Sequence, residues 1–147
     1  MIRKYDFYCG GKWPWSNLDG RGIANNFTSV HGGLAILDGA TGLLWQQSGS
    51  PNDMTFAEAQ KYIEELNRQK FAGYNDWRLP TLEEAMSLME PVQNRGLYID
   101  AKFDGNQQWI WTSDMHSAGR AWYVYFVFGS CGHYFIDDDN YVRAVRS

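Results

Sequence analysis

The alternation of apolar and polar residues predicts several short strands in the C-terminal third of the chain. Strand-like runs lie at residues 107–114, 121–129 and 141–147, and residues 130–136 are expected to form a loop. Successive side chains of a strand point to opposite faces, yet residues 121–129 are apolar on both. One face carries Trp122, Val124, Phe126 and Phe128, and the other carries Tyr123, Tyr125 and Val127. Either this run is buried on both sides, or one aromatic face contacts a partner.

Two amphipathic helices are predicted before these runs, and each begins with a capping box. Thr55–Glu58 and Thr81–Glu84 both place a threonine at the N-cap and a glutamate three residues later. The apolar residues that follow recur at helical spacing, so each helix has one buried stripe. The stripes are Phe56, Ala59, Ile63 and Leu66 in the first helix, and Leu82, Ala85, Met86 and Met89 in the second. Pro91 ends the second helix.

The N-terminal part of the chain has no long periodic segment. Residues 1–33 are rich in glycine and asparagine and are expected to be irregular. Residues 34–47 predict a hairpin of two short strands about the Asp38-Gly39 turn. The order of hairpin, two helices and antiparallel strands predicts a single α+β domain over residues 1–147.

Composition narrows the classes of function. Hydrophobic residues make up 44% and charged residues 20% of the chain, which fits a globular domain with its own core. Aromatic residues reach 16%, so they either plug the core or in part serve recognition. The net charge of −4 argues against a nucleic-acid partner, whose binding surface would be basic. No run approaches the roughly twenty apolar residues of a membrane span, so we expect no membrane insertion.

The two cysteines and the N-terminus bear on the cellular location. Cys9 and Cys131 are too few for a disulfide scaffold, and their spacing leaves a bridge and two free thiols both open. The first residues are basic but have no apolar stretch behind them, so they are not a secretory signal. Taken by itself the chain would be cytoplasmic, and export would need a signal or partner outside it.

Several short sequence motifs, called phrases below, follow one another along the chain from the predicted hairpin onward. They are TGLLWQQ (Thr41–Gln47), TFAEA, GYNDWRLPTLEE (Gly73–Glu84), WIWTSD, AWYVYF and YVRAVR. In these phrases residues 34–147 resemble the Lcl C-terminal domain family, named after the terminal domain of a bacterial collagen-like adhesin. The most specific phrase is DWRLP, in which Asp76 is expected to hold a turn or pair with Arg78. Trp77 and Leu79 are expected to plug the core between the helices.

The resemblance implies a C-type-lectin-like fold, with two helices packed on a small twisted antiparallel sheet and long irregular loops. It also implies a binding module at a bacterial cell or phage surface, with no defined catalytic residues. The same broad fold is used by variable proteins of diversity-generating retroelements, in which mutations at template adenines rewrite selected residues near the C-terminus.

The C-terminal composition is compatible with such diversification. After Trp122 the chain has no Lys, Glu, Gln, Met or Trp, and residues 130–137 use only residue types that adenine changes in an AAC codon reach. A strand-rich tail explains part of this gap, because Lys and Glu are depleted in strands. Diversification is therefore one hypothesis. The other is that the chain is an ordinary member of the family with a fixed sequence.

The expected ligand-binding surface lies within residues 113–137. If Trp122, Val124 and Phe126 face the core, the alternate side chains point outward and form an aromatic patch, with a polar rim from the preceding residues. The candidate ligand-binding residues are Asp114, His116, Arg120, Tyr123, Tyr125, Val127, Phe128, Ser130, Cys131, His133, Tyr134 and Phe135. The ligand is expected to be a protein or a glycan.

Two alternatives to an open patch stand beside this interpretation. The N-terminal segment, with Trp13 and Trp15, could fold over the tyrosines and bury them. The patch could also be a fixed subunit interface of an assembly module, because the oligomeric state is not encoded in any pattern of the sequence.

Metal and enzyme chemistry are not expected. Cys131 and His133 lack the second ligand pair of a zinc site, and no third group orients them as a nucleophile and its base. The acidic residues 137–140 lack the terminal glutamate of a calcium loop, so calcium bound through scattered oxygens is the one alternative to no cofactor. The sequence therefore predicts a non-enzymatic recognition domain.

Overall fold

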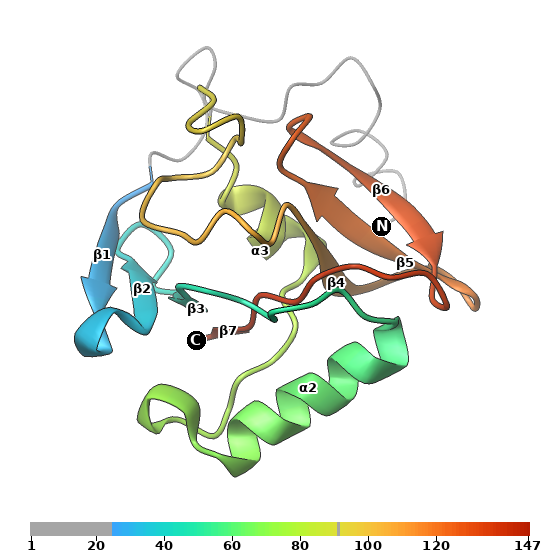
Figure 1. Cartoon of the computed structure of the whole chain (residues 1–147), viewed down its shortest axis with the longest axis horizontal. Coiled ribbons are helices and arrows are strands. Elements are labelled where there is room, and N and C mark those ends of the chain that lie inside the picture. Colours follow the sequence, from blue (N-terminus) through green and yellow to red (C-terminus); the bar gives the residue numbers. More distant parts are fainter. Residues whose placement is uncertain (1–24, 91) are drawn as a thin grey trace.

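Two antiparallel sheets and two α-helices make up the regular structure of the described residues (Figure 1). The computed structural model describes residues 25–90 and 92–147. The first sheet has the order β1-β2-β3-β7 and the second β4-β5-β6. Their strands are β1 (Phe27–Val30), β2 (Ala35–Asp38), β3 (Leu44–Gln46), β7 (Val145–Arg146), β4 (Trp109–Ser117), β5 (Arg120–Tyr125) and β6 (Ser130–Phe135). The predicted α+β class is confirmed.

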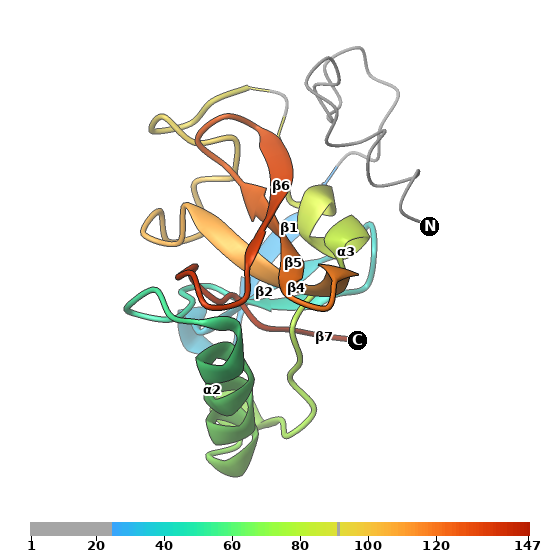
Figure 2. The ribbon, with the colours of Figure 1, turned by 90° about the vertical axis from the view of Figure 1, so that its right-hand side faces the viewer.

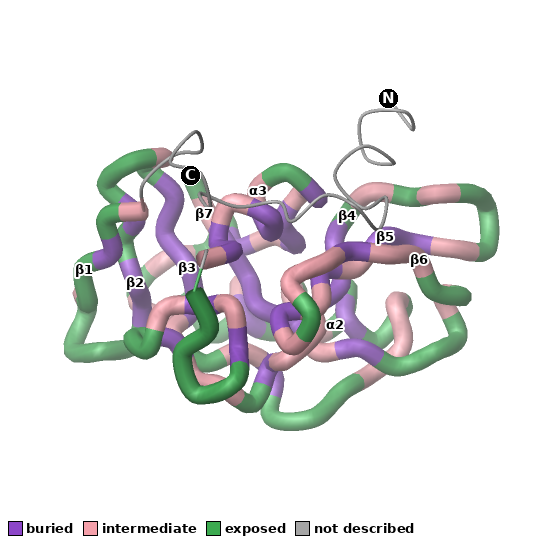
Figure 3. Tube along the Cα trace, turned by 90° about the horizontal axis from the view of Figure 1, so that it is seen from above, coloured by how far each residue is buried: buried purple, intermediate pink, exposed green. Residues whose placement is uncertain are grey.

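The helices lie at different places relative to the sheets. Helix α3 (Leu82–Ser87) lies between the two sheets and α2 (Phe56–Arg68) at one end of the molecule, as Figures 1 and 2 show. Short 3₁₀ turns, η1 (His31–Gly33) and η2 (Phe71–Gly73), complete the elements. Buried residues line the interior, and many exposed ones lie in peripheral loops and turns (Figure 3). No helix of residues 25–90 and 92–147 is long and apolar enough to cross a membrane.

Both predicted capping boxes are confirmed. The Thr55 hydroxyl accepts from the Glu58 amide while the Glu58 side chain accepts from the Thr55 amide, and Thr81 and Glu84 do the same. Satisfying these first-turn donors fixes where each helix begins. Helix α3 is only six residues long and ends at Ser87, several residues before the predicted stop at Pro91.

The hairpin of β2 and β3 is confirmed, with a connection longer than a two-residue turn. The carboxylate of Asp38 accepts from the amide of Ala40 at 2.9 Å and from the hydroxyl of Thr41 at 3.1 Å. The amide of Gly42 donates to the carbonyl of Asp38 at 2.8 Å. Asp38 thus holds the connection through both its side chain and its backbone carbonyl, and aspartate is common in turns for this reason.

Three expectations about strands are corrected. Residues 27–30, expected to be irregular, form β1, and residues 130–135, expected to form a loop, form β6. Of residues 141–147 only Val145–Arg146 is a strand, because side chains take the place of a neighbouring strand: the Val142 and Ala144 amides donate to Ser50 Oγ at 2.9 Å and Gln46 Oε1 at 2.8 Å.

The DWRLP phrase is structural, as expected, but its ion pairs differ from the expectation. Trp77 is 2% exposed, and its indole donates to the carbonyl of Phe71 at 2.9 Å. Asp76 pairs with Arg146 at 2.6 Å rather than with Arg78. Arg78 pairs with Glu84 instead, also at 2.6 Å. Sequence proximity suggested the wrong partner, because the backbone of Arg78 bridges β7 at Val145 and places Arg146 beside Asp76.

Arg143 is fully buried and joins three separate segments through its guanidinium group. Its Nη1 donates to the carbonyls of Gln46 and Gln47, and its Nη2 to the Asp104 carbonyl at 2.9 Å and to Gln107 Oε1 at 3.1 Å. Burial lowers the pKa of Arg143 to about 10, so the group stays charged at neutral pH. No carboxylate of the described residues lies within ion-pair distance of it, so the carbonyl dipoles that accept its hydrogen bonds and the more distant charge of Asp104 stabilise the guanidinium group.

We expect Arg143→Met to reduce the free energy of unfolding by at least about 3 kcal/mol, because four buried or partly buried acceptors lose their donors together. Urea denaturation followed by tryptophan fluorescence measures this loss. Arg68→Ala is the control, since Arg68 only pairs with Glu65 on the exposed side of α2 and should leave the midpoint nearly unchanged. Equal midpoints for the two variants would contradict the role assigned to Arg143.

Candidate functional site

The sheet β4-β5-β6 has one face turned into the core. In an antiparallel pair, residues directly opposite each other share a face, and the register places Val124 opposite both Ile110 and Cys131. These three residues and Trp122 are buried in one cluster with residues of α3 such as Met86. The predicted inward orientation of Trp122, Val124 and Phe126 is confirmed, since all are at most 2% exposed.

The opposite face of this sheet is aromatic, and half of it is covered. Trp111 lies opposite Tyr123, and Ala121 opposite Tyr134. Trp111 and Ala121 are buried beneath α2, Leu79 and the returning C-terminal segment; the other members of that cluster are Ala59 and Val142, with Met54, Phe56, Tyr62, Ile63 and Ile136 packed against it. Among residues 25–90 and 92–147, the covering segments stop short of the other end of the sheet.

The uncovered half carries six aromatic side chains in successive contact, which we call the aromatic face. Its members are Trp109, Tyr123, Tyr125, Phe128, Tyr134 and Tyr141. Ring centroids lie 4.7 Å apart for Tyr123 and Tyr134, 5.6 Å for Trp109 and Tyr125, and 5.0 Å for Tyr125 and Phe128. Rings at these separations stabilise one another beyond the area they bury, so the face holds its shape without a ligand.

A small hollow of about 120 Å³ opens in the middle of the aromatic face. It is lined by Trp109, Tyr123, Tyr125 and Tyr134. Tyr123 and Tyr125 are partly exposed, Tyr134 is 41% exposed, and Phe128 at the margin is 72% exposed. The predicted outward orientation of the two central tyrosines is therefore confirmed for the residues that the structure describes.

The aromatic face is electrically neutral. Burial, followed by the neighbouring hydroxyls of Tyr134 and Tyr125, raises the pKa of Tyr123, so this phenol stays protonated at neutral pH. The hydroxyls of Tyr123, Tyr125 and Tyr134 form no hydrogen bond with any residue of 25–90 or 92–147. Three phenols are thus available to donate to or accept from a ligand.

Gly132 fixes the position of the Tyr123 ring. The two residues are paired across β5 and β6, and a methyl group on Gly132 would lie 3.1 Å from Tyr123 Cε1. The ring therefore lies flat against the bare backbone of β6. A larger residue at position 132 would push the ring outward and change the hollow.

The expected polar rim lies elsewhere, which corrects the prediction. Asp114 accepts from the Leu82 amide at 2.6 Å, at the start of α3. The rings of His116 and His133 stack at 3.8 Å, and Trp122 packs edge-on against both. Both histidines therefore lie on the inward side of the sheet.

Arg120 and Phe135 also lie away from the aromatic face. They are paired in register one residue beyond Ala121 and Tyr134, which reverses the direction of their side chains. The guanidinium group of Arg120 lies 3.9 Å from the centroid of the Phe135 ring, and its Nη1 is 3.3 Å from His133 Nδ1. The prediction placed Phe135 on the patch because it took residues 130–136 as a loop.

The remaining candidates are divided between the core and the aromatic face. Val127 packs against the main core, and Cys131 is buried and in a disulfide, so neither extends the face. Ser130 lies opposite Tyr125 and belongs to the outward side. Cys9, and the suggested covering of the tyrosines by Trp13 and Trp15, lie outside the described residues.

Two members of the aromatic face were missed by sequence reasoning. Trp109 could have been found, because alternation places it on the same face of β4 as Trp111. The pairing of β4 with β5 then puts Trp109 opposite Tyr125. Tyr141 carries no such signal. It reaches Trp109, at 5.5 Å between ring centroids, because its backbone bridges β4 at Ile110.

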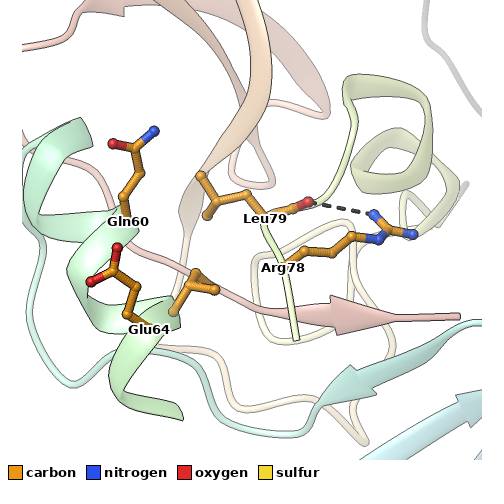
Figure 4. Close-up of a pocket in the computed structure, with 5 residues that line it drawn as sticks. Gln60, Glu64, Arg78 and Leu79 are labelled. Carbon is orange, nitrogen blue, oxygen red and sulfur yellow. Dashed lines mark hydrogen bonds between the residues drawn. The ribbon is translucent and has the colours of Figure 1, made fainter. Parts of the chain in front are cut away.

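Other kinds of binding site among the described residues would be a metal site or a larger groove. No three His, Cys, Asp or Glu side chains of the described residues lie close enough to hold a metal ion. A wider groove of about 450 Å³ runs between α2 and residues 78–79, lined by Gln60, Ile63, Glu64, Arg78 and Leu79 (Figure 4). Its arginine already donates to Glu84 and to the carbonyl of Leu79.

We expect Asp114→Ala to reduce the free energy of unfolding by about 1 kcal/mol while leaving ligand binding unchanged, because this carboxylate satisfies a first-turn amide of α3. Thermal unfolding by circular dichroism measures the loss. Asp139→Ala, in the exposed acidic turn, is the matched control and should unfold like the wild type. Weaker ligand binding by Asp114→Ala at unchanged stability would restore Asp114 to the binding surface.

One comparison with known proteins gives a match. The family model described as the Lcl C-terminal domain matches residues 34–146, which is more than half of the chain. No curated protein matches the sequence.

Proposed function

Since the chain belongs to the Lcl C-terminal domain family over residues 34–146, we propose that it is a non-enzymatic recognition domain. It binds a protein or glycan ligand through the aromatic face. The observation that carries this proposal is the set of six rings in successive contact on the half of the β4-β5-β6 sheet that the described residues leave uncovered. Exposed clusters of this kind usually mark interaction sites.

The residue types of the aromatic face suit recognition. Tyrosine and tryptophan offer a large contact area with little loss of side-chain freedom, and such residues dominate the energetic centres of interfaces. The rings rest on a sheet whose other face is packed against α3, so little ordering is needed when a ligand binds. Preorganisation of this kind raises affinity.

The proposed fold is C-type-lectin-like. Support comes from the two helices, the two antiparallel sheets and the long irregular connection from residue 88 to residue 108. A cell or phage surface is the proposed location, again from the family resemblance. No cofactor is part of the proposal, and an enzymatic role is not supported, because a disulfide-bonded Cys131 offers no thiolate to act as a nucleophile.

Retroelement diversification is part of the proposal for the C-terminal residues. Tyr123, Tyr125, Phe128 and Tyr134 belong to the aromatic face and are all residue types reachable by adenine changes in an AAC codon. Sequencing the surrounding locus tests this directly. A reverse-transcriptase gene and an imperfect, adenine-substituted copy of this coding segment are expected, and a locus without them rules diversification out.

A second candidate function is a fixed subunit interface. The exposure of Phe128, at 72%, favours it, since large rings this exposed are often covered in an assembly. Light scattering of the full chain decides between the two functions. An obligate oligomer in which Tyr125→Ala releases monomers supports the interface, whereas a stable monomer supports ligand recognition.

For recognition we expect Tyr125→Ala to weaken binding at least tenfold to ligands identified on a glycan and protein array, because Tyr125 contacts three other rings of the face. Biolayer interferometry measures the affinity. Tyr134→Ala is a second variant that removes a more exposed ring and is less able to disturb folding.

Phe135→Ala is the matched control for both variants. Phe135 lies in the same strand as Tyr134 and is 54% exposed, but it lies on the opposite side of the sheet. Its loss should leave binding unchanged. If Phe135→Ala weakens binding and the two tyrosine variants do not, the ligand uses the other side and the proposal fails.

A further inference from the structure

We infer that the hollow of the aromatic face takes a single uncharged sugar ring, so that the ligand is a neutral glycan presenting hydroxyl groups. This inference rests on the proposed function and names the ligand class for the same site. It is carried by three properties of the hollow: its lack of charge, its unused phenol hydroxyls and its shape.

The first property is the absence of ionised groups around the hollow. The four lining residues are aromatic, and among the described residues no Asp, Glu, Lys or Arg is a cause of the raised pKa of Tyr123, whose electrostatic neighbours are Tyr134 and Tyr125. Arg120, the basic residue of β5, lies over Phe135 on the opposite side of the sheet. A carboxylate or sulfate in the hollow would lose its water without gaining a counter-ion, which is costly. Acidic ligands are therefore disfavoured.

The second property is the supply of hydrogen-bonding groups. Each phenol can donate one hydrogen bond and accept two, and those of Tyr123, Tyr125 and Tyr134 have no partner among the described residues. An apolar group over the hollow would leave these hydroxyls buried and unsatisfied. A proline-rich segment could only accept hydrogen bonds from them through its carbonyls, because proline has no N–H to donate. A sugar hydroxyl both donates and accepts, so it can satisfy each of them.

The third property is the shape of the hollow. The rings of Trp109 and Tyr125 are nearly perpendicular, with 83° between their planes, so the lining offers aromatic surfaces in two orientations. The volume of about 120 Å³ is well below the roughly 300 Å³ at which sites for drug-sized ligands begin. It suits one sugar ring, with the apolar C–H bonds on one side of the chair against an aromatic ring and the hydroxyls directed at the phenols.

Saturation-transfer NMR on the full chain tests the inference with defined probes. The neutral probes are the methyl glycosides of glucose, galactose, mannose and N-acetylglucosamine, with cellotriose and mannotriose as longer forms. The comparison probes are a glucuronic-acid disaccharide, tetramethylammonium and a decaproline peptide. We expect at least one neutral saccharide to bind, with an affinity that does not change between low and high salt.

Matched variants place the probe in the hollow. Tyr134→Phe keeps the ring and removes only the hydroxyl, so we expect it to weaken saccharide binding about two- to tenfold. Gly132→Ala should also weaken binding, because its methyl group displaces Tyr123. Phe135→Ala should have no effect. Circular dichroism melts of each variant separate these effects from misfolding.

The outcomes separate the inference from the proposed function. If only acidic, cationic or proline-rich probes bind and Tyr134→Ala abolishes that binding, the sugar is wrong and the aromatic face remains the site. If no neutral saccharide binds, the inference is likewise overturned. If saccharides bind equally well to the wild type, Tyr125→Ala and Tyr134→Ala, both the inference and the proposed function fail.

Discussion

The hydrogen bonds of the C-terminal segment decide which part of the second sheet is exposed. Arg143 anchors the segment to β3 and to residues 104–107 through four acceptors, and Ser50 and Val142 exchange hydrogen bonds just before it. With that path fixed, Val142 and Ile136 cover Trp111 and Ala121, while Tyr141 reaches only as far as Trp109. The aromatic face is the part of the sheet that this segment leaves open.

Burying the charge of Arg143 without a directly paired carboxylate costs free energy, but the buried group fixes the positions of the segments around it. An ion pair joins two points, whereas the planar guanidinium group of Arg143 orients carbonyls from separate segments at once. The hydrogen bonds of Arg143 also bring β7 beside β3 and Arg78, and β7 becomes the last strand of the first sheet. The two sides of β4-β5-β6 then differ in chemistry: one carries neutral tyrosines with unused hydroxyls, and the other carries Arg120 and two stacked histidines.

Much of this arrangement could be predicted from local patterns, and the errors share one physical origin. Capping boxes, the hairpin and the alternation of Trp122 to Phe126 depend on neighbouring residues, and all are confirmed. The misplaced residues depended on strand pairing: with β6 taken as a loop, nothing assigned Phe135 and His133 to a side, and a shift of one residue reverses every side chain. Gly132 made β6 hard to predict, because glycine is depleted in strands. The partners of Asp76 and Asp114 were missed for the same reason, since each lies far away in sequence.

The most direct test of the central claim is to map a bound ligand onto the side chains by aromatic ¹H–¹³C NMR. The account predicts that the ring signals of Trp109, Tyr123, Tyr125 and Tyr134 shift on titration while those of Phe135 and His116 stay in place. Ligand-induced shifts confined to Phe135, His116 and His133, with the four lining rings unmoved, would contradict it.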